Sequence, residues 1–281
     1  MRLDLHVHTT ASDGSSSPAE VVRLAANGGL DVLAITDHDT VAGIPAALEA
    51  AANASLQLIP GIEVSSTHEG AEYHILGYFV DPQSDAIQAH GRHAVEGRES
   101  RMDQMVDRLR RQGLLIEMSD VLDAAGPDRS AIARPHLARA LVVKGYASSV
   151  VDAFDRLIGD GHPAYVPTGL ATPEEAIGLI LEAGGTPVWA HPPMHALTRL
   201  LPTFIGAGLK GLEVYRPRAT AGHIRKLERA AKAAGILMTG GSDWHDGERG
   251  HALGTFFVTE KDVGELFEAG GMSGRSSERQ E

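Results

Sequence analysis

Short apolar runs recur along the chain, and nearly every run ends in histidine or carboxylate residues. The runs are about as long as a β-strand and are rich in Val, Ile and Leu. Continuous apolar character over such a length is typical of strands that are covered on both faces of a sheet. We expect seven strands, within residues 3–8, 31–39, 56–65, 72–80, 185–192, 208–215 and 235–245.

Helical patterns lie between several of these runs. Residues 17–28 begin with the letters SPAE and end at glycine, and residues 172–184 begin with TPEE and end in the same way. Ser or Thr followed by Pro, with Glu three positions after the cap, is typical of a helix start, and glycine is typical of a helix end. Strand, helix and strand in succession predict parallel pairing and an α/β fold.

The middle of the chain has a different pattern. Residues 85–161 contain charged stretches with helical periodicity and no convincing strand. We therefore predict that residues 1–84 and 162–270 form one barrel domain, and that residues 85–161 form a helical insertion that caps the substrate. Residues 271–281 are polar and rich in Gly and Ser, which predicts a flexible tail.

Histidine and carboxylate side chains gather at the ends of the predicted strands. A strand would place His6 and His8 on one face, roughly 7 Å apart along the chain and within reach of one ion. In a parallel barrel, functional residues lie at the carboxyl ends of the strands. Burying many ionisable groups without partners is costly, and metal ions would satisfy them together. The other residues of this kind are Asp37, His38, Asp39, Glu63, His74, His191, Glu213, Asp243 and His245.

The composition narrows the functional classes. The chain has 281 residues, no cysteine and a formal net charge of -12. It offers no thiolate chemistry, and its charge disfavours binding to duplex DNA, where phosphate contacts dominate affinity. No segment approaches the ~18–20 apolar residues of a membrane span, and the first residues lack the apolar core of a signal peptide. We expect a cytoplasmic protein with no membrane partner.

The ordered motifs resemble the PHP family, which is named for polymerase and histidinol phosphatase. The motifs are HxH at 6–8, Asp13, TDH at 36–38, GIE at 61–63, HILGY at 74–78, AHP at 190–192 and GSDWH at 241–245. The resemblance implies a distorted (β/α)7 barrel of the TIM type that holds a cluster of divalent metal ions. It also implies hydrolysis of phosphoric esters, in which a hydroxide that bridges two of the ions attacks phosphorus.

By the same resemblance, three ions share one set of ligands. His6, His8, Glu63 and Asp243 would bind the first ion, Glu63, His74 and His191 the second, and Asp13, His38 and His245 the third. Mixed imidazole and carboxylate ligands suit several metals, so the ligands do not choose between manganese, iron and zinc. We expect manganese, with iron and zinc as alternatives.

Further roles follow from the same comparison of motifs. Asp13, Glu63 and Asp243 are the predicted catalytic residues, and Asp37 is expected to orient a ligand histidine. Seven histidines match no motif, and we expect them to be mostly solvated: His68, His90, His93, His162, His195, His223 and His251.

One segment of the predicted insertion bears on the substrate. Residues 130–145, SAIARPHLARALVVKG, resemble a segment of the nucleotide-acting branch of the family. Arg134 offers a bidentate fork for phosphate, with His136 beside it, and Lys144 is a weaker candidate. Glu213 and Arg216 follow a strand and are further candidates for substrate contact, with a salt bridge at the barrel rim as the alternative.

The expected reaction is removal of the 3'-phosphate from nucleoside 3',5'-bisphosphates, which gives a nucleoside 5'-monophosphate and phosphate. One alternative is a 5'-3' exoribonuclease that trims short RNA, and a second is histidinol-phosphate phosphatase. A third, from another class, is a structural metal-binding PHP module without catalysis. The products released from a panel of phosphorylated substrates distinguish these alternatives.

Overall fold

The computed structural model describes residues 1–126, 132–167, 171–245 and 252–270. Eight strands form one sheet in the order β7-β6-β5-β4-β3-β2-β1-β8, which curls into a nearly closed α/β barrel of the TIM type. Val7 pairs with Trp244, and the His8 N–H donates to the Trp244 carbonyl at 2.9 Å, so the chain after β7 closes against β1. The strands are β1 (Arg2–Val7), β2 (Val32–Ile35), β3 (Gln57–His68), β4 (Ala71–Tyr78), β5 (Thr186–Trp189), β6 (Gly211–Tyr215), β7 (Leu237–Gly240) and β8 (Val258–Thr259).

The sheet departs from an all-parallel barrel at two strands, β4 and β8, and β8 pairs antiparallel with β1. β4 runs antiparallel to both of its neighbours, β3 and β5. β3 and β4 form a hairpin whose turn residues, Glu69 and Gly70, have φ angles of 51° and 80°, as in a type I′ turn. His74 therefore projects from the body of an antiparallel strand and not from the carboxyl end of a parallel one. The pattern of apolar residues does not predict β8, because this strand has only two residues.

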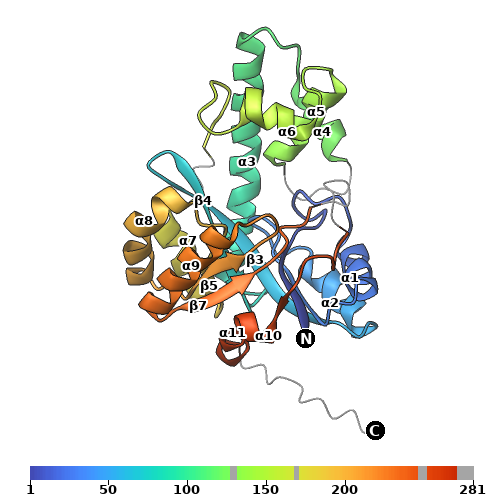
Figure 1. The fold of residues 1–281 in the computed structure, drawn as a ribbon. Helices are drawn as coiled ribbons and strands as arrows, with labels where there is room; N and C mark the ends of the chain where they lie inside the picture. The colour runs from blue at the N-terminus through green and yellow to red at the C-terminus, as the bar shows by residue number, and fades with distance from the viewer. Residues whose placement is uncertain (127–131, 168–170, 246–251, 271–281) are drawn as a thin grey trace.

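Helices cover the outside of the barrel (Figure 1). Both predicted helix starts are confirmed: Ser17 accepts a hydrogen bond from the Glu20 N–H at 3.3 Å, and Thr172 and Glu175 cap each other in a reciprocal pair. In Figure 1, α1 and α2 lie on one side of the barrel and α7, α8 and α9 on the other. These helices are α1 (Pro18–Asn27), α2 (Ile44–Ala52), α7 (Pro173–Glu182), α8 (Met194–Gly206), α9 (Ala221–Ala234), α10 (Glu260–Val263) and α11 (Glu265–Ala269).

The described residues between 85 and 161 are helical and contain no strand. In Figure 1 these helices rise above one end of the barrel. They share an apolar core to which Met105 and Leu109 contribute from one helix and Leu137 and Leu141 from another. The first of these helices also belongs to the barrel core, where Ile87 is buried. The helices are α3 (Asp85–Arg111), α4 (Met118–Ala125), α5 (Arg134–Val143), α6 (Val150–Ala153) and a π-helical turn, η1 (Phe154–Ile158).

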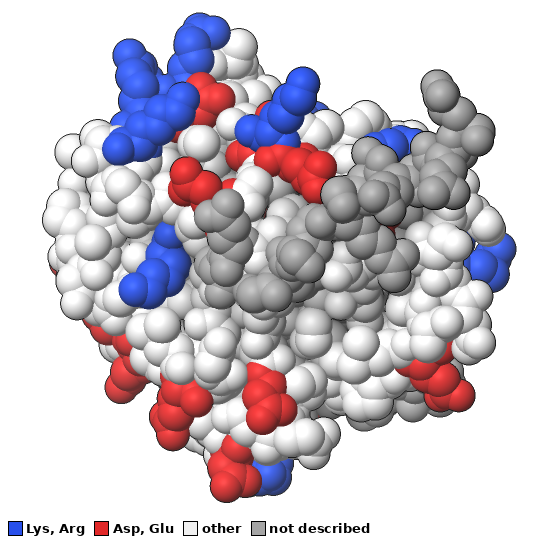
Figure 2. Space-filling view, turned by 90° about the horizontal axis from the view of Figure 1, so that it is seen from below, with Lys and Arg blue, Asp and Glu red and all other residues white. Residues whose placement is uncertain are grey.

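His251, which we expected to be solvated, and residues 271–281, which we expected to form a flexible tail, lie outside the described residues. Of the described helices, none combines the length and the apolar character that crossing a membrane requires. Figure 2 shows the face opposite the insertion, where Lys and Arg side chains are interspersed with Asp and Glu side chains.

Candidate metal centre

The first predicted ligand set lies together at the end of β1. The His6 and His8 Nε2 atoms are 3.1 Å apart. Glu63 Oε2 lies 3.2 Å from the first of them and 3.3 Å from the second. Asp243 Oδ1 lies 3.5 Å from His6 Nε2 and 3.3 Å from His8 Nε2. Two imidazoles and two carboxylates thus converge on one point, as the ligands of a single ion must.

The second set uses the other oxygen of the same carboxylate. Glu63 Oε1 lies 3.0 Å from His74 Nδ1 and 3.0 Å from His191 Nε2. Glu63 is buried, with 1% of its surface exposed, and it lies between the two sets. A carboxylate that directs one oxygen to each set has the geometry of a bridging ligand.

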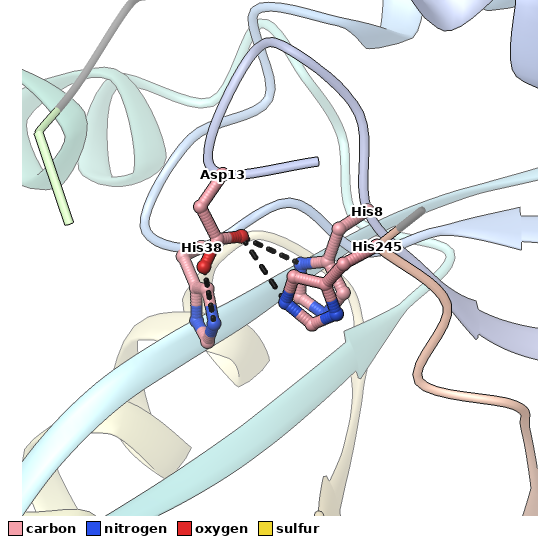
Figure 3. A group of neighbouring side chains, drawn as sticks. All are labelled: His8, Asp13, His38 and His245. Carbon is pink, nitrogen blue, oxygen red and sulfur yellow. Dashed lines mark ion pairs between the residues drawn. The ribbon is translucent and has the colours of Figure 1, made fainter. Parts of the chain in front are cut away.

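The third set surrounds Asp13 (Figure 3). His245 Nε2 lies 3.2 Å from Asp13 Oδ1, and His38 Nε2 lies 4.0 Å from Asp13 Oδ2. The rings of His8 and His245 stack with their centroids 4.1 Å apart. His38 also faces the other sets, because its Nδ1 lies 3.2 Å from Glu63 Oε2. The three sets therefore form one continuous cluster with shared members.

The unsatisfied atoms of this cluster fit a metal centre. Among the described residues, His8 Nδ1, His38 Nδ1 and Glu63 Oε2 are buried and have no hydrogen-bond partner. An unpaired polar atom in a buried position costs free energy that a metal–ligand bond would recover. The donors are imidazole nitrogens and carboxylate oxygens, which suit a divalent transition ion. The His, Asp and Glu side chains of the cluster thus fit the divalent metal ions that the family resemblance implies.

The carboxylates and histidines of the cluster shift one another's pKa values. Burial would raise the pKa of Glu63, but His38, His6 and His74 hold that pKa well below its usual range. Burial would lower the pKa of His74, but the Glu63 carboxylate raises it to about 10. Ligand imidazoles must be neutral, so binding of a divalent ion to this cluster releases protons.

Two candidate ligands have backbone conformations that residues other than glycine rarely adopt. His191 has a φ angle of 30° and Asp243 one of 55°. The Asp243 N–H donates to the His6 carbonyl at 2.9 Å, which anchors the loop after β7 to β1. Gly241 permits that approach, because a Cβ at this position would lie 2.3 Å from the His6 Cβ. Strain of this kind persists where the surrounding contacts impose it, and functional sites are its usual place.

The residues behind the ligands differ from the predictions. Glu213 is fully buried, and its Oε1 lies 2.8 Å from His6 Nδ1, so it lies behind a candidate ligand and not on the surface of the site. Asp37 does not orient a histidine. It accepts hydrogen bonds from the Thr9 N–H and hydroxyl and from the Ser12 hydroxyl, each at 2.7 Å. Asp37 therefore shapes the loop that carries Asp13.

A cleft of about 140 Å³ opens between the metal ligands and the insertion. Asp13, His38, His74 and His245 line one side of it, and Arg98, Arg101 and Arg134 line the other. The Arg134 guanidinium is half-buried and pairs with Glu72 at 2.5 Å and with Asp160 at 2.6 Å. Glu72 lines the cleft as well, and each of the three arginines is paired with a carboxylate, so the arginine side faces the candidate ligands with its charge partly neutralised.

The other predicted substrate residues lie outside the lining of this cleft. His136 is buried, and its Nδ1 accepts a hydrogen bond from the Ala133 N–H at 3.0 Å, so it caps α5. Lys144 lies at the opposite end of α5 and pairs with Asp120 at 2.9 Å. Arg216 follows β6 and is half-buried. Of the five candidates for substrate contact, the structure brings only Arg134 to the cleft.

Sequence reasoning missed the charged residues of α3. His90, which we expected to be solvated, has its Nε2 3.0 Å from Asp39 Oδ1. Arg98 pairs with Asp39 and is buried, as is Arg101. A signal was present, because both arginines fall on the same helix face as apolar residues such as Met105. Charges on the apolar face of a helix indicate buried ion pairs or a site.

Comparison with known proteins agrees with this geometry. Residues 4–83 match the family model described as the PHP domain. A 3',5'-nucleoside bisphosphate phosphatase from Chromobacterium violaceum is 34% identical to the chain, over 90% of each sequence. The 5'-3' exoribonuclease Rnm from Salmonella typhimurium is 34% identical, over 86% of this chain and 84% of the relative. A phosphoribosyl 1,2-cyclic phosphate 1,2-diphosphodiesterase from Eggerthella lenta is 34% identical, over 86% of this chain and 93% of the relative.

A solved structure supports the same assignment. It belongs to a Bifidobacterium adolescentis protein to which metal-dependent phosphoesterase activity is ascribed. It is 33% identical, covers 95% of this chain and 96% of its own, and superposes with a TM-score of 0.85. The fold and the cluster thus define a metal-dependent hydrolase of phosphoric esters. The chain belongs to the PHP family and groups with its nucleotide-acting branch.

Proposed function

We propose that the protein removes the 3'-phosphate of nucleoside 3',5'-bisphosphates and releases a nucleoside 5'-monophosphate. The observation that carries the proposal is the cleft with a metal-ligand side and an arginine side. A bisphosphate has two anionic groups, so one phosphate can face the ligands while the other meets Arg134. The name of the Chromobacterium violaceum relative supports this substrate.

In this proposal, residues on one side of the cleft bind the metal ions, and residues on the other side bind the distal phosphate. The nine His, Asp and Glu ligands would hold three divalent ions, for which manganese is our choice. Bound there, such ions supply an activated water and neutralise charge on the phosphate. Arg134 and Arg101 would position the distal phosphate, and Phe154, over which the Arg134 guanidinium lies at 5.6 Å, adds an apolar wall. We propose catalytic roles for Asp13, Glu63 and Asp243, because these carboxylates contact the candidate ligand histidines of all three sets.

A second candidate function is 5'-3' exoribonuclease activity on short RNA. The Salmonella typhimurium relative, at the same 34% identity, carries that name. The same cleft would then bind the terminal 5'-phosphate at Arg134 and place the first phosphodiester at the metal ligands. The two functions differ in product, because the phosphatase releases inorganic phosphate and the exoribonuclease releases a mononucleotide.

A substrate panel with Mn²⁺ tests the proposal. It contains adenosine 3',5'-bisphosphate, AMP, histidinol phosphate, a cyclic nucleotide and a short 5'-phosphorylated RNA, with phosphate and mononucleotide release both measured. We expect the highest kcat/KM for the bisphosphate and a loss of about tenfold to a hundredfold in Arg134→Ala. Arg156→Ala is the matched control, because Arg156 pairs with Asp152 in the insertion but does not line the cleft. Mononucleotide release from RNA as the main activity, or preference for histidinol phosphate, would contradict the substrate assignment.

A further inference from the structure

We propose that Glu213 is a positioning residue that fixes the ligands of two metal positions at once. Glu213 lies on β6 and has 0% of its surface exposed. Its Oε1 lies 2.8 Å from His6 Nδ1, and its Oε2 accepts a hydrogen bond from the His191 backbone N–H at 2.7 Å. His6 belongs to the first ligand set and His191 to the second. One buried carboxylate thus contacts both sets from behind.

The contact with His6 selects the tautomer of its ring. A carboxylate accepts hydrogen bonds, so the proton of a neutral His6 resides on Nδ1. The lone pair of Nε2 is then directed at the cluster, where Glu63 Oε2 lies 3.2 Å away. A carboxylate partner of this kind orients the imidazole and raises its basicity as a ligand.

The contact with His191 acts on the backbone. His191 has a φ angle of 30°, which a residue with a side chain adopts only when its surroundings impose it. The hydrogen bond from its N–H to Glu213 is one such constraint. The result is an imidazole whose Nε2 lies 3.0 Å from Glu63 Oε1. Glu63 joins the two sets at the front of the cluster, and Glu213 joins the same two sets at the back.

No structural salt bridge accounts for this carboxylate. Among the described residues, no Lys or Arg lies within ion-pair distance of Glu213, and its ion-pair partner is His6. A fully buried carboxylate whose only ion-pair partner is a histidine is costly, and a role in holding that histidine as a metal ligand accounts for its presence. Glu213 also lies outside the lining of the cleft, so substrate contact does not explain it.

Manganese binding by Glu213→Gln tests this role without measuring catalysis. Glutamine has nearly the same shape, but it can accept from only one of the two donors, and its NH₂ group opposes the other. The metal-free chain is titrated with Mn²⁺, and free Mn²⁺ is followed by electron paramagnetic resonance. We expect Mn²⁺ affinity to fall about tenfold to a hundredfold. Glu228→Gln is the matched control, because it removes a carboxylate that contacts Tyr215 at 3.0 Å and no ligand.

The melting temperature of the metal-free chain separates positioning from a general loss of stability. Weakened Mn²⁺ binding in a Glu213→Gln chain that melts close to the wild type supports the proposal. Wild-type affinity and stoichiometry in this variant would overturn it. If the glutamine variant does not fold, Glu213→Asp keeps the charge but is one methylene shorter, and wild-type affinity in that chain would overturn the proposal equally.

The proposal rests on the metal centre but not on the choice of substrate. A wild-type chain that binds no Mn²⁺, Fe²⁺ or Zn²⁺ would refute the metal centre and this role together. A wild-type chain that binds metal but prefers another phosphoester would refute the proposed substrate and leave the Glu213 experiment valid.

Discussion

The Asp39 carboxylate, directly after the ligand His38, holds the Arg98 guanidinium of α3 in a buried ion pair. His90 of the same helix contacts Asp39 as well. The helix that carries the insertion is therefore tied to the barrel at a position next to the metal ligands.

Removal of Arg98 should destabilise the chain strongly. Arg98→Ala leaves Asp39 buried without its main cationic partner, so we expect a loss of about 3–5 kcal/mol in the free energy of unfolding. Urea denaturation followed by circular dichroism measures it. Arg23→Ala is the control, because Arg23 forms a solvent-exposed pair with Glu20 that contributes little to stability. Similar midpoints for the two variants would contradict a structural role of the buried pair.

Metal should stabilise the chain. Because the ligand cluster contains buried atoms without hydrogen-bond partners, Mn²⁺ at a hundred times its Kd should add about 2.7 kcal/mol. For a chain of this size the melting temperature should rise by roughly 4–5 °C. Calorimetry with chelator and with Mn²⁺ measures the shift. Glu63→Gln alters the carboxylate that faces two ligand sets, and an unreduced shift in that variant would argue against the cluster as the binding site.

The Glu72 carboxylate should lower the affinity of the cleft for phosphate. Its carboxylate pairs with Arg134 at 2.5 Å and lies 3.5 Å from Arg101, and both arginines line the cleft. In Glu72→Gln these guanidinium groups lose a competing anion, so we expect the inhibition constant for inorganic phosphate to fall about tenfold. Glu69→Gln is the control, because it breaks an exposed pair with Arg199. Unchanged phosphate inhibition in the Glu72 variant would place the anion elsewhere.

Two glycine substitutions should act in opposite directions. At Gly241 a Cβ would lie 2.3 Å from the His6 Cβ, so Gly241→Ala should cost roughly 1–3 kcal/mol of stability and displace a ligand. At Gly178, within α7, a Cβ would meet nothing within 4 Å. Gly178→Ala should therefore raise stability by about 1 kcal/mol, because alanine favours the helix. Denaturation midpoints that move together would refute this account.

The proximity of several candidate ligands could be predicted from the sequence, because their spacing follows strand geometry. His6 and His8 stand at a spacing of two on an apolar run, and the later ligands follow further runs. The structure brings all nine of these residues into one cluster. Strand spacing accounts for only part of this set, because Asp13 follows no apolar run and is assigned through the family resemblance, and His74 projects from the body of the antiparallel strand β4.

The misassigned residues depend on contacts between distant segments. Glu213 follows a strand just as the ligands do, and nothing in its local sequence shows that it lies behind His6. Likewise, Arg98 and Asp39 are 59 positions apart, so no periodicity connects them. The antiparallel course of β4 depends on the two-residue turn at Glu69 and Gly70, whose letters lack the Asn-Gly or Asp-Gly signature of such turns.

The helix α3 contributes to both apolar cores, and it therefore fixes the distance between the barrel and the insertion. Ile87 anchors one part of the helix in the barrel, and Met105 anchors the other part in the insertion. A continuous helix does not bend like a linker, so the span from the metal ligands to the cleft arginines is set by a count of helical residues. Because one helical turn holds about 3.6 residues, only a change of about seven residues, which is two turns and roughly 10.5 Å, would return Arg98 and Arg101 to the face that contacts the barrel.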